Sequence, residues 1–156
     1  MTQFPSLQNA VRAHYEQYVY PQFPLWASVR TCDTYALNLD AWWARFNGEK
    51  LPEQEQKILL AGCGSFSPYP TAVANPKAKI TALDLSAANL RKAKLHNWMH
   101  GYFNVDFIQG DITSAPDSDS LKDHRFHFID CYGVLHHIPD VIAALNTLHS
   151  LLKTGG

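Results

Sequence analysis

The sequence predicts an α/β fold in which helices cover both faces of a doubly wound, mainly parallel sheet. Short apolar runs at residues 57–61, 78–83, 105–109 and 126–131 are spaced as strands, and the first two have the pattern of strands buried on both faces. Segments with helical spacing lie between these runs, and this alternation gives a parallel sheet through right-handed crossover connections. The 156 residues are enough for one domain.

Two helices are expected before the first strand. The first covers residues 6–20 and is ended by the Pro-containing segment 21–24, and the second covers residues 33–46, with Gly48 as its C-terminal stop. This part of the chain is rich in Tyr, Trp and Phe, whose rings either pack on the sheet as a cap or close over a bound ligand. We therefore predict a helical cap or lid over residues 1–50.

Residues 51–156 are expected to form the α/β domain itself. A short helix is predicted within residues 70–74. A longer helix starts at the N-cap Ser86 and ends near His100, where Gly101 is the expected left-handed C-cap.

The last third of the chain is predicted to hold a loop, a strand and a helix. Residues 114–123 are polar and acidic, as in a loop, and Pro139 and Asp140 open the final helix. The apolar stripe of that helix, at helical spacing, consists of Val141, Leu145, Leu148 and Leu152.

Glycines and a carboxylate stand where two of the predicted strands end. Gly62 and Gly64 follow the first strand, and Asp84 ends the second, 84 − 64 = 20 residues after Gly64. Ligands bind outside the carboxyl ends of parallel strands, and glycines let a ligand lie against bare backbone. A carboxylate at this spacing suits hydrogen bonding to a ribose diol. The sequence therefore predicts a nucleoside-containing ligand.

The glycine pattern helps to separate two classes of nucleoside cofactor. The dinucleotide fingerprint G-x-G-x-x-G would need a third glycine where Ser67 stands, and the prolines that follow make a poor helix start. A ligand without phosphates, such as S-adenosylmethionine, tolerates this better. An NAD-dependent oxidoreductase is kept as an alternative, because it would share the Gly-x-Gly turn and Asp84.

Four segments, in this order, resemble motifs of the class I S-adenosylmethionine-dependent methyltransferases. Residues 58–64 (Ile-Leu-Leu-Ala-Gly-Cys-Gly) resemble the first motif, and Gly-Asp-Ile at 110–112 resembles the end of the third strand. Residues 128–138 resemble the fourth strand and its following turn, and residues 151–156 the turn before the fifth strand. The resemblance implies a Rossmann-like sheet of order 3-2-1-4, with S-adenosylmethionine as cofactor and Asp84 on its ribose.

The resemblance also implies which residues bind the cofactor. They stand at the ends of the four strands: Ala61, Gly62, Cys63, Gly64, Asp84, Leu85, Asp111, Ile112, Cys131 and Tyr132. Asp111 would lie near the adenine amino group, or it serves only as the cap of a turn. Methyl transfer is an in-line displacement in which the cofactor supplies the reactivity, so we assign no catalytic residue.

His136 and His137 are the candidates for a general base, because they follow the fourth strand at the ligand-binding edge. In the structural alternative, which we favour, one packs under the turn and the other caps the final helix. A metal site with Cys131 and Asp140 is disfavoured, because adjacent side chains point apart, and no metal is expected. Cys63 is expected to be a small packing residue. Five other histidines are expected at the surface or at an edge of the sheet: His96, His100, His124, His127 and His149.

The composition indicates which binding partners and which cellular compartment to expect. A formal net charge of −1 gives no basic excess that would indicate nucleic acid. Three scattered cysteines fit free thiols in a reducing compartment, so a cytoplasmic location is expected. The N-terminus lacks the pattern of a signal peptide, and no apolar run approaches the length of a membrane span. We expect a small-molecule or unidentified methyl acceptor and no membrane.

Two further alternatives stay open, a non-catalytic binding module and a truncated one. Members of the family continue with a fifth strand beside the fourth, whereas only four strands are counted here. We therefore expect the C-terminal strands to be missing and the fourth strand to be an open edge that invites self-association. The alternative is a minimal domain whose N-terminal helices cover that side.

Overall fold

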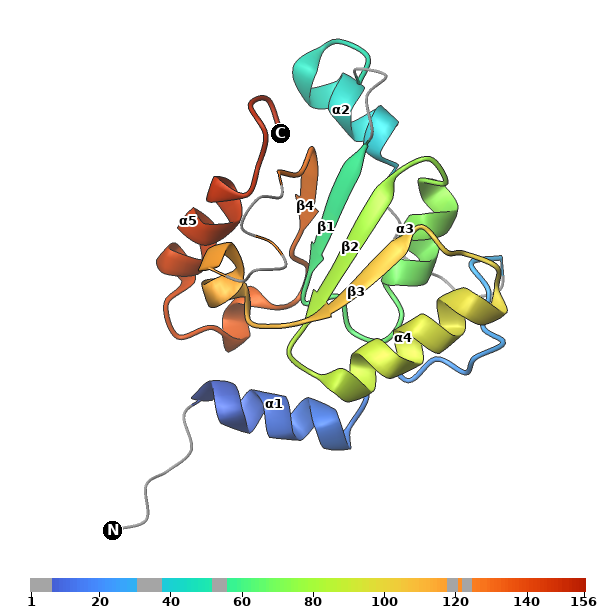
Figure 1. Cartoon of the computed structure of the whole chain (residues 1–156), viewed down its shortest axis with the longest axis vertical. Helices are drawn as coiled ribbons and strands as arrows, with labels where there is room; N and C mark the ends of the chain where they lie inside the picture. Colours follow the sequence, from blue (N-terminus) through green and yellow to red (C-terminus); the bar gives the residue numbers. More distant parts are fainter. Residues whose placement is uncertain (1–6, 31–37, 52–55, 118–120, 122–124) are drawn as a thin grey trace.

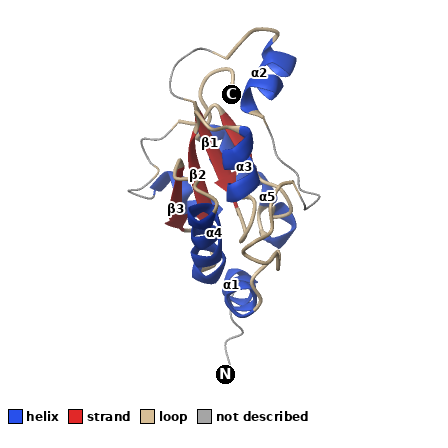
Figure 2. Cartoon of the chain, turned by 90° about the vertical axis from the view of Figure 1, so that its right-hand side faces the viewer, coloured by secondary structure: helices blue, strands red, loops and turns tan. Residues whose placement is uncertain are grey.

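A computed structural model gives the fold, and it describes residues 7–30, 38–51, 56–117, 121 and 125–156. Parallel strands form one four-stranded sheet in the order β3-β2-β1-β4 (Figure 1), which confirms the predicted fold class and strand order. Helices lie on both faces of this sheet (Figure 2). The strands are β1 (Lys57–Ala61), β2 (Lys79–Asp84), β3 (Val105–Gln109) and β4 (Phe128–Asp130).

The N-terminal part contains two helices, α1 (Leu7–Gln17) and α2 (Leu39–Asn47), and α1 is shorter than predicted. The side chain of Asn38 caps α2 by accepting a hydrogen bond from the N–H of Ala41 at 2.9 Å. Gly48 ends α2 in the left-handed conformation (φ 70°), as predicted. Residues 33–37 of the predicted helix lie outside the described residues.

One face of the sheet is covered by α3 (Pro68–Ala74) and α4 (Ala87–Met99). The prediction that the prolines make a poor helix start was wrong, because Pro68 occupies the first turn of α3, where a missing N–H costs nothing. Ser86 caps α4 by accepting from the N–H of Asn89. The core on this face combines Leu39, Trp43, Leu51, Ile58, Leu60, Cys63, Ala72, Ala78, Ile80, Ala82 and Leu90.

The other face is covered by α5 (Val141–Ser150) and the 3₁₀ helices η1 (Ile112–Asp117) and η2 (Leu135–His137). The predicted stripe of α5 was partly wrong, since Val141 and Leu145 are 36% and 44% exposed. The buried core on this face consists of Leu59, Ala61, Leu83, Ile112, Ala115, Leu121, Phe126, Ala144, Leu148 and Leu151. The predicted loop at 114–123 begins inside η1, and part of it lies outside the described residues.

Strand β4 is shorter than the predicted 126–131 and pairs with β1 over three residues. Just before it, Phe126 pairs with the segment that follows α5. The N–H of Phe126 donates to the carbonyl of Leu151, and the N–H of Lys153 donates to the carbonyl of Phe126, each at 2.8 Å. The edge next to β4 is therefore occupied at Phe126 by residues 151–153.

Two histidines expected at the surface are buried instead. His127 is 5% exposed, accepts a hydrogen bond from the N–H of Lys57 at 3.0 Å, and faces Trp43. His96 is fully buried and donates to the carbonyl of Ala27 at 2.9 Å. Burial lowers the pKa of both imidazoles, so both favour the neutral form.

The ring of His100 stacks on that of His96 and is part-buried. It donates to the carbonyl of Leu25 at 3.0 Å. The two rings together tie the segment before residue 30 to α4. His149 is exposed on α5, as expected, and His124 lies outside the described residues. No helix in the described ranges is long and apolar enough to cross a bilayer.

Candidate cofactor site

A cavity of about 520 Å³ lies beyond the carboxyl ends of the strands. Helix α1 crosses below these strand ends (Figure 1), and its residues Gln8, Val11 and Tyr15 line the cavity. The predicted cofactor residues that line the cavity are Gly62, Cys63, Gly64, Asp84, Leu85, Asp111, Ile112 and Tyr132. The topology therefore brings the ends of all four strands to one space, because parallel strands share a carboxyl edge.

The remaining two predicted residues, Ala61 and Cys131, pack against the core under α5 rather than lining the cavity. Side chains alternate along a strand, so the neighbouring Asp130 faces the cavity where Cys131 does not. Burial raises the pKa of Cys131 to about 11 and that of the fully buried Cys63 well above its usual range. Both thiols are free and favour the protonated form, which suits packing rather than nucleophilic attack.

The glycines of the β1 turn are required by neighbouring protein groups. Gly62 and Gly64 have φ of 78° and 60°, a region that side chains rarely adopt. A Cβ on Gly62 would collide with Val134, and one on Gly64 would lie 2.9 Å from the carbonyl oxygen of Tyr20. The space that these Cβ atoms would enter is filled by protein atoms, whereas the backbone of both glycines lines the cavity, so the ligand contact predicted from the sequence stays a prediction.

Asp84 is 9% exposed and joins the β1 turn to the start of α4. One carboxylate oxygen accepts from the N–H of Gly64 at 2.7 Å, and the other accepts from Ser86 at 2.8 Å and the side chain of Asn89 at 3.4 Å. Burial raises the pKa of Asp84, and these three hydrogen bonds oppose that rise. A carboxylate offers about four acceptor positions, so the oxygen that faces Gly64 retains one for a ligand hydroxyl.

The C-terminal end of α1 is fastened to the start of α4. The hydroxyl of Ser86 donates to the carbonyl of Tyr15 at 3.1 Å, and the N–H of Ala87 donates to the carboxylate of Glu16 at 2.6 Å. A carboxylate at this position is also favourable because a helix N-terminus carries partial positive charge.

The segment that follows α1 is held by the β1 turn. The N–H of Tyr20 donates to the side-chain oxygen of Asn89 at 3.1 Å, and its carbonyl accepts from the N–H of Ser65 at 2.9 Å. The hydroxyl of Ser65 donates to the carbonyl of Pro21. The side of the cavity opposite the sheet is therefore formed by a segment that is bonded to the β1 turn and to α4.

His137 lies inside the cavity and faces α1. Its Nε2 is 3.1 Å from the hydroxyl of Tyr15, and its ring centre is 3.9 Å from that of His136. Burial, followed by the charges of His136 and His14, lowers the pKa of His137 and so favours its neutral imidazole. The expectation that one of this pair caps the final helix was wrong, because Asp140 caps α5 by accepting from Ala143.

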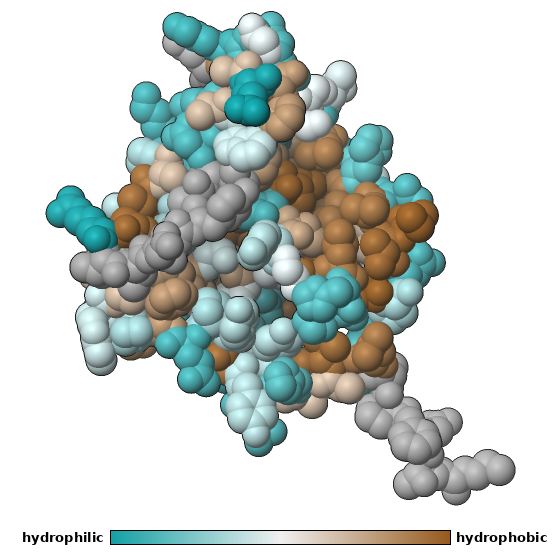
Figure 3. Space-filling model, turned by 180° about the vertical axis from the view of Figure 1, so that it is seen from behind, coloured by the Kyte–Doolittle hydropathy of each residue, from teal (hydrophilic) through white to brown (hydrophobic). Residues whose placement is uncertain are grey.

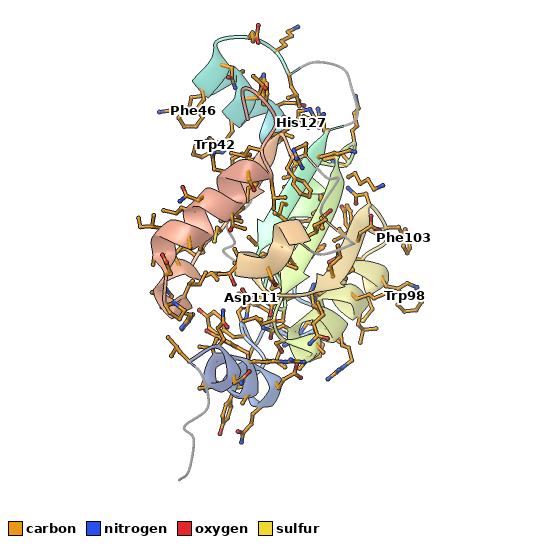
Figure 4. The ribbon with its side chains drawn as sticks, turned by 60° about the vertical axis from the view of Figure 1, so that its left-hand side comes forward. Trp42, Phe46, Trp98, Phe103, Asp111 and His127 are labelled. Atoms are coloured by element: carbon orange, nitrogen blue, oxygen red, sulfur yellow. The ribbon has the colours of Figure 1, made fainter. Side chains whose placement is uncertain are left out.

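Asp111 caps a turn, which is one of the two roles that the sequence suggested. One carboxylate oxygen accepts from the N–H and the hydroxyl of Thr113, each at 2.8 Å, which makes it the cap of the turn into η1. Asp111 also lines the cavity, and Figure 4 shows it at the end of the sheet that faces α1.

Sequence reasoning missed the residues that the N-terminal part contributes to the cavity. They are Gln8, Val11, Tyr15, Tyr20, Pro21 and Phe23, together with Asn89 of α4. The available signal was the spacing of Val11 and Tyr15 on one face of α1, which indicated a packed face without showing what it packs on.

Comparison with known proteins gives a consistent set of matches. A family model described as a methyltransferase domain matches residues 52–156. An uncharacterized protein of Synechococcus sp. is 33% identical over 152 residues, which are 97% of this chain and 36% of that protein. The ubiquinone biosynthesis O-methyltransferase of Saccharophagus degradans is 31% identical over 113 residues, or 72% of this chain and 46% of that enzyme.

Among solved structures, the magnesium protoporphyrin IX methyltransferase of Synechocystis has a similar fold. The TM-score is 0.64 at 20% identity, over 98% of this chain and 75% of that one. The chain described here spans less than half the length of the two curated relatives.

Proposed function

The chain belongs to the family of S-adenosylmethionine-dependent methyltransferase domains, and we propose that its cavity binds S-adenosylmethionine in an enzyme that methylates a small molecule. The observation that carries this proposal is Asp84, a carboxylate at the end of β2 that lines the cavity and keeps an acceptor position open. A ribose diol is the group for which such a carboxylate is suited.

The cavity fits the proposed cofactor in size and in chemistry. Its volume of about 520 Å³ lies within the range of about 300–1,000 Å³ that is usual for small-molecule sites. In this proposal Asp84 binds the ribose, Leu85 and Ile112 enclose the adenine, and Asp111 lies near the adenine amino group. The turn at Gly62 to Gly64 lies under the methionine part.

When bound, the cofactor supplies a methyl group on a sulfonium. The part of the protein is to fix the geometry of an in-line displacement and to exclude water. Helix α1 and the segment up to Phe23 do the second, because they line the side of the cavity opposite the sheet, and this part of residues 1–50 acts as a lid in this proposal. Helix α2 lies at the other end of the sheet (Figure 1) and contributes no residue to the cavity. If the acceptor is a hydroxyl, the neutral His137 is the group placed to take its proton, with Tyr15 as its present partner.

We further propose that the acceptor is a small molecule with a hydroxyl group. The name of one curated relative, an O-methyltransferase of ubiquinone biosynthesis, agrees with this class. Aromatic side chains of Tyr15, Phe23 and Tyr132 line the same cavity and suit a ring-shaped acceptor. A binding module without turnover is the second candidate, and a methyl-transfer assay separates the two.

The proposal also includes a cytoplasmic location and self-association of two copies. A cytoplasmic location agrees with the free thiols of Cys63 and Cys131. Self-association of two copies would use the outer edge of β4 beyond Phe126, which already pairs with Leu152. Size-exclusion chromatography over a range of concentrations tests the second point.

Calorimetric titration tests the cofactor. The wild-type chain is titrated with S-adenosylhomocysteine, the demethylated product, and separately with NAD. Saturable binding of S-adenosylhomocysteine without binding of NAD supports the proposal, and the reverse result would assign the site to a dinucleotide. Transfer of radioactive methyl from S-adenosylmethionine to a panel of phenols and alcohols then distinguishes an enzyme from a binding module.

A further inference from the structure

The C-terminal end of α4 carries exposed apolar side chains that the cofactor cavity does not use. Leu95, Trp98, Met99 and Phe103 are 43%, 64%, 50% and 74% exposed, and none of them lines the cavity. We refer to these four residues as the α4 patch. Exposed apolar side chains that gather on one element, rather than scattering singly, indicate a contact surface.

Near its C-terminal end, α4 turns polar side chains inward and apolar side chains outward, whereas its earlier turns bury Ala88, Leu90 and Ala93. His96 and Asn97 are turned into the protein and are 0% and 1% exposed, while Leu95 and Trp98 face solvent. His96 is held inside by its bond to the carbonyl of Ala27. Because polar residues occupy the buried side of this last part of α4, the apolar residues on its outer side need a different environment to be stabilised.

The four residues of the α4 patch are neighbours in space. Residues three and four apart lie on one face of a helix, which joins Leu95, Trp98 and Met99. Gly101 turns the chain with φ 78°, and the N–H of Tyr102 donates back to Asn97 at 2.9 Å, so the chain reverses at the helix end. Trp98 and Phe103 project outward on the same side of the molecule (Figure 4).

Positive charge adjoins the patch. The sequence of α4 contains Arg91, Lys92 and Lys94 and no Asp or Glu, and Arg91 and Lys94 are exposed. Arg91, Leu95 and Trp98 follow at helical spacing, so the charges lie one to two turns before the aromatic end.

Asp106 is the exposed carboxylate closest in sequence to the α4 patch, and it lies on the other side of the sheet. Val105 and Phe107 pack against the core under α4, whereas Ile108 packs against the core under α5. Asp106 alternates with Val105 and Phe107 along β3, so it belongs to the α5 side. The negative charge of Asp106 therefore does not neutralise the basic residues of α4.

We propose that the α4 patch docks this domain on a membrane surface that carries anionic phospholipid headgroups. Trp, Phe, Leu and Met at a helix end suit the boundary between headgroups and acyl chains, while Arg91 and Lys94 pair with phosphates. The proposal does not depend on the cofactor, since the patch lies outside the cavity.

The experiment is cosedimentation of the purified chain with vesicles of phosphatidylcholine alone and of phosphatidylcholine mixed equally with phosphatidylglycerol. Binding is expected to rise with phosphatidylglycerol and to fall with salt. The double variant Trp98→Ser, Phe103→Ser is expected to weaken the partition coefficient at least about tenfold, as expected for loss of two buried aromatic side chains. The double variant Arg91→Glu, Lys94→Glu is expected to remove the dependence on phosphatidylglycerol.

Matched controls come from α2, whose Phe46 lies far from Trp98 and Phe103 (Figure 4). Phe46 is 70% exposed, close to the 74% of Phe103, and Arg45 is an exposed helical arginine. Phe46→Ser and Arg45→Glu are expected to leave vesicle binding unchanged. Because all of these side chains are exposed, each variant is expected to retain the wild-type melting curve, which circular dichroism checks.

Equal binding of the wild-type chain and the Trp98, Phe103 variant would overturn the proposal, and so would binding that ignores vesicle charge. A third result would overturn it in favour of a second copy of this chain. In that case the wild type binds no vesicles, elutes as a dimer in size-exclusion chromatography, and becomes a monomer in the Trp98, Phe103 variant.

Discussion

The substitution Asp84→Asn separates the structural role of this carboxylate from its proposed role in binding. It keeps the size of the side chain and replaces one acceptor oxygen by an NH₂ donor. Whichever oxygen is replaced, the new donor faces a backbone N–H, that of Gly64 at 2.7 Å or that of Ser86 at 2.8 Å. One hydrogen bond is lost when the NH₂ faces Gly64, and two are lost when it faces Ser86 and Asn89. In either orientation a buried N–H is left without its partner.

The stability cost follows from that unpaired N–H. A buried donor without a partner costs about 1–3 kcal/mol, and 1 kcal/mol shifts the melting temperature by about 2–4 °C in a domain of roughly this size. The melting temperature should therefore fall by about 2–12 °C. Loss of the charged acceptor should weaken the binding of S-adenosylmethionine by roughly 1.5–3 kcal/mol, which raises Kd about 10- to 150-fold.

Differential scanning fluorimetry measures the first effect and isothermal titration calorimetry the second. Asp140→Asn is the matched control, because Asp140 only caps α5 and Asn caps a helix equally well. The control should change neither quantity. A variant Asp84→Asn that melts normally and binds normally would refute the reasoning, and one that melts lower but binds normally would limit Asp84 to a structural role.

Three further predictions follow from the same contacts. Gly64→Ala should lower the free energy of unfolding more than Gly48→Ala in urea titrations, because both have positive φ but only the Cβ on Gly64 would meet a carbonyl oxygen at 2.9 Å; equal losses would contradict this. Burial holds the pKa of His96 below its unfolded value of about 6.5. The neutral ring therefore contributes fully to the stability of the protein above about pH 6.5, and this contribution is lost as the pH falls below 6.5. The drop in urea midpoint from pH 7.5 to 5.5 should therefore be smaller in His96→Gln than in the wild type, and an equal drop would refute the assignment. Tyr15→Phe removes the hydroxyl next to His137 and should speed amide hydrogen exchange in α1 roughly three- to tenfold, whereas unchanged exchange would show that the contact does not hold the helix.

The elements with strong local signals were predicted well from the sequence. Residues 57–61 and 105–109 coincide with β1 and β3, since an apolar run between polar or turn residues specifies a strand locally. Ser86 and Gly48 were correct as caps, because capping depends on a few neighbouring atoms. Most of the predicted cofactor residues line one cavity, because the strand ends they follow are brought together by the topology.

The errors concern residues whose environment is set by distant parts of the chain. His96 and His127 are buried because Ala27 and Lys57, 69 and 70 residues away, supply backbone partners that a local pattern does not reveal. The buried side of α5 is set by the position of η1 and Phe126, so its buried residues are Ala144 and Leu148, followed by Leu151 just after the helix.

The contacts that close the cavity also bear on the order of folding. Glu16 meets Ala87 across 71 residues, Tyr20 meets Asn89 across 69, and Tyr15 meets His137 across 122. Contacts over such separations bear a larger loop-closure entropy than the helices and the β1–β2 pairing, and they become favourable only after α4 and η2 are in place. Helix α1 is therefore expected to dock on α4 and η2 last. During refolding, the ability to bind cofactor should then appear later than the secondary structure of the sheet.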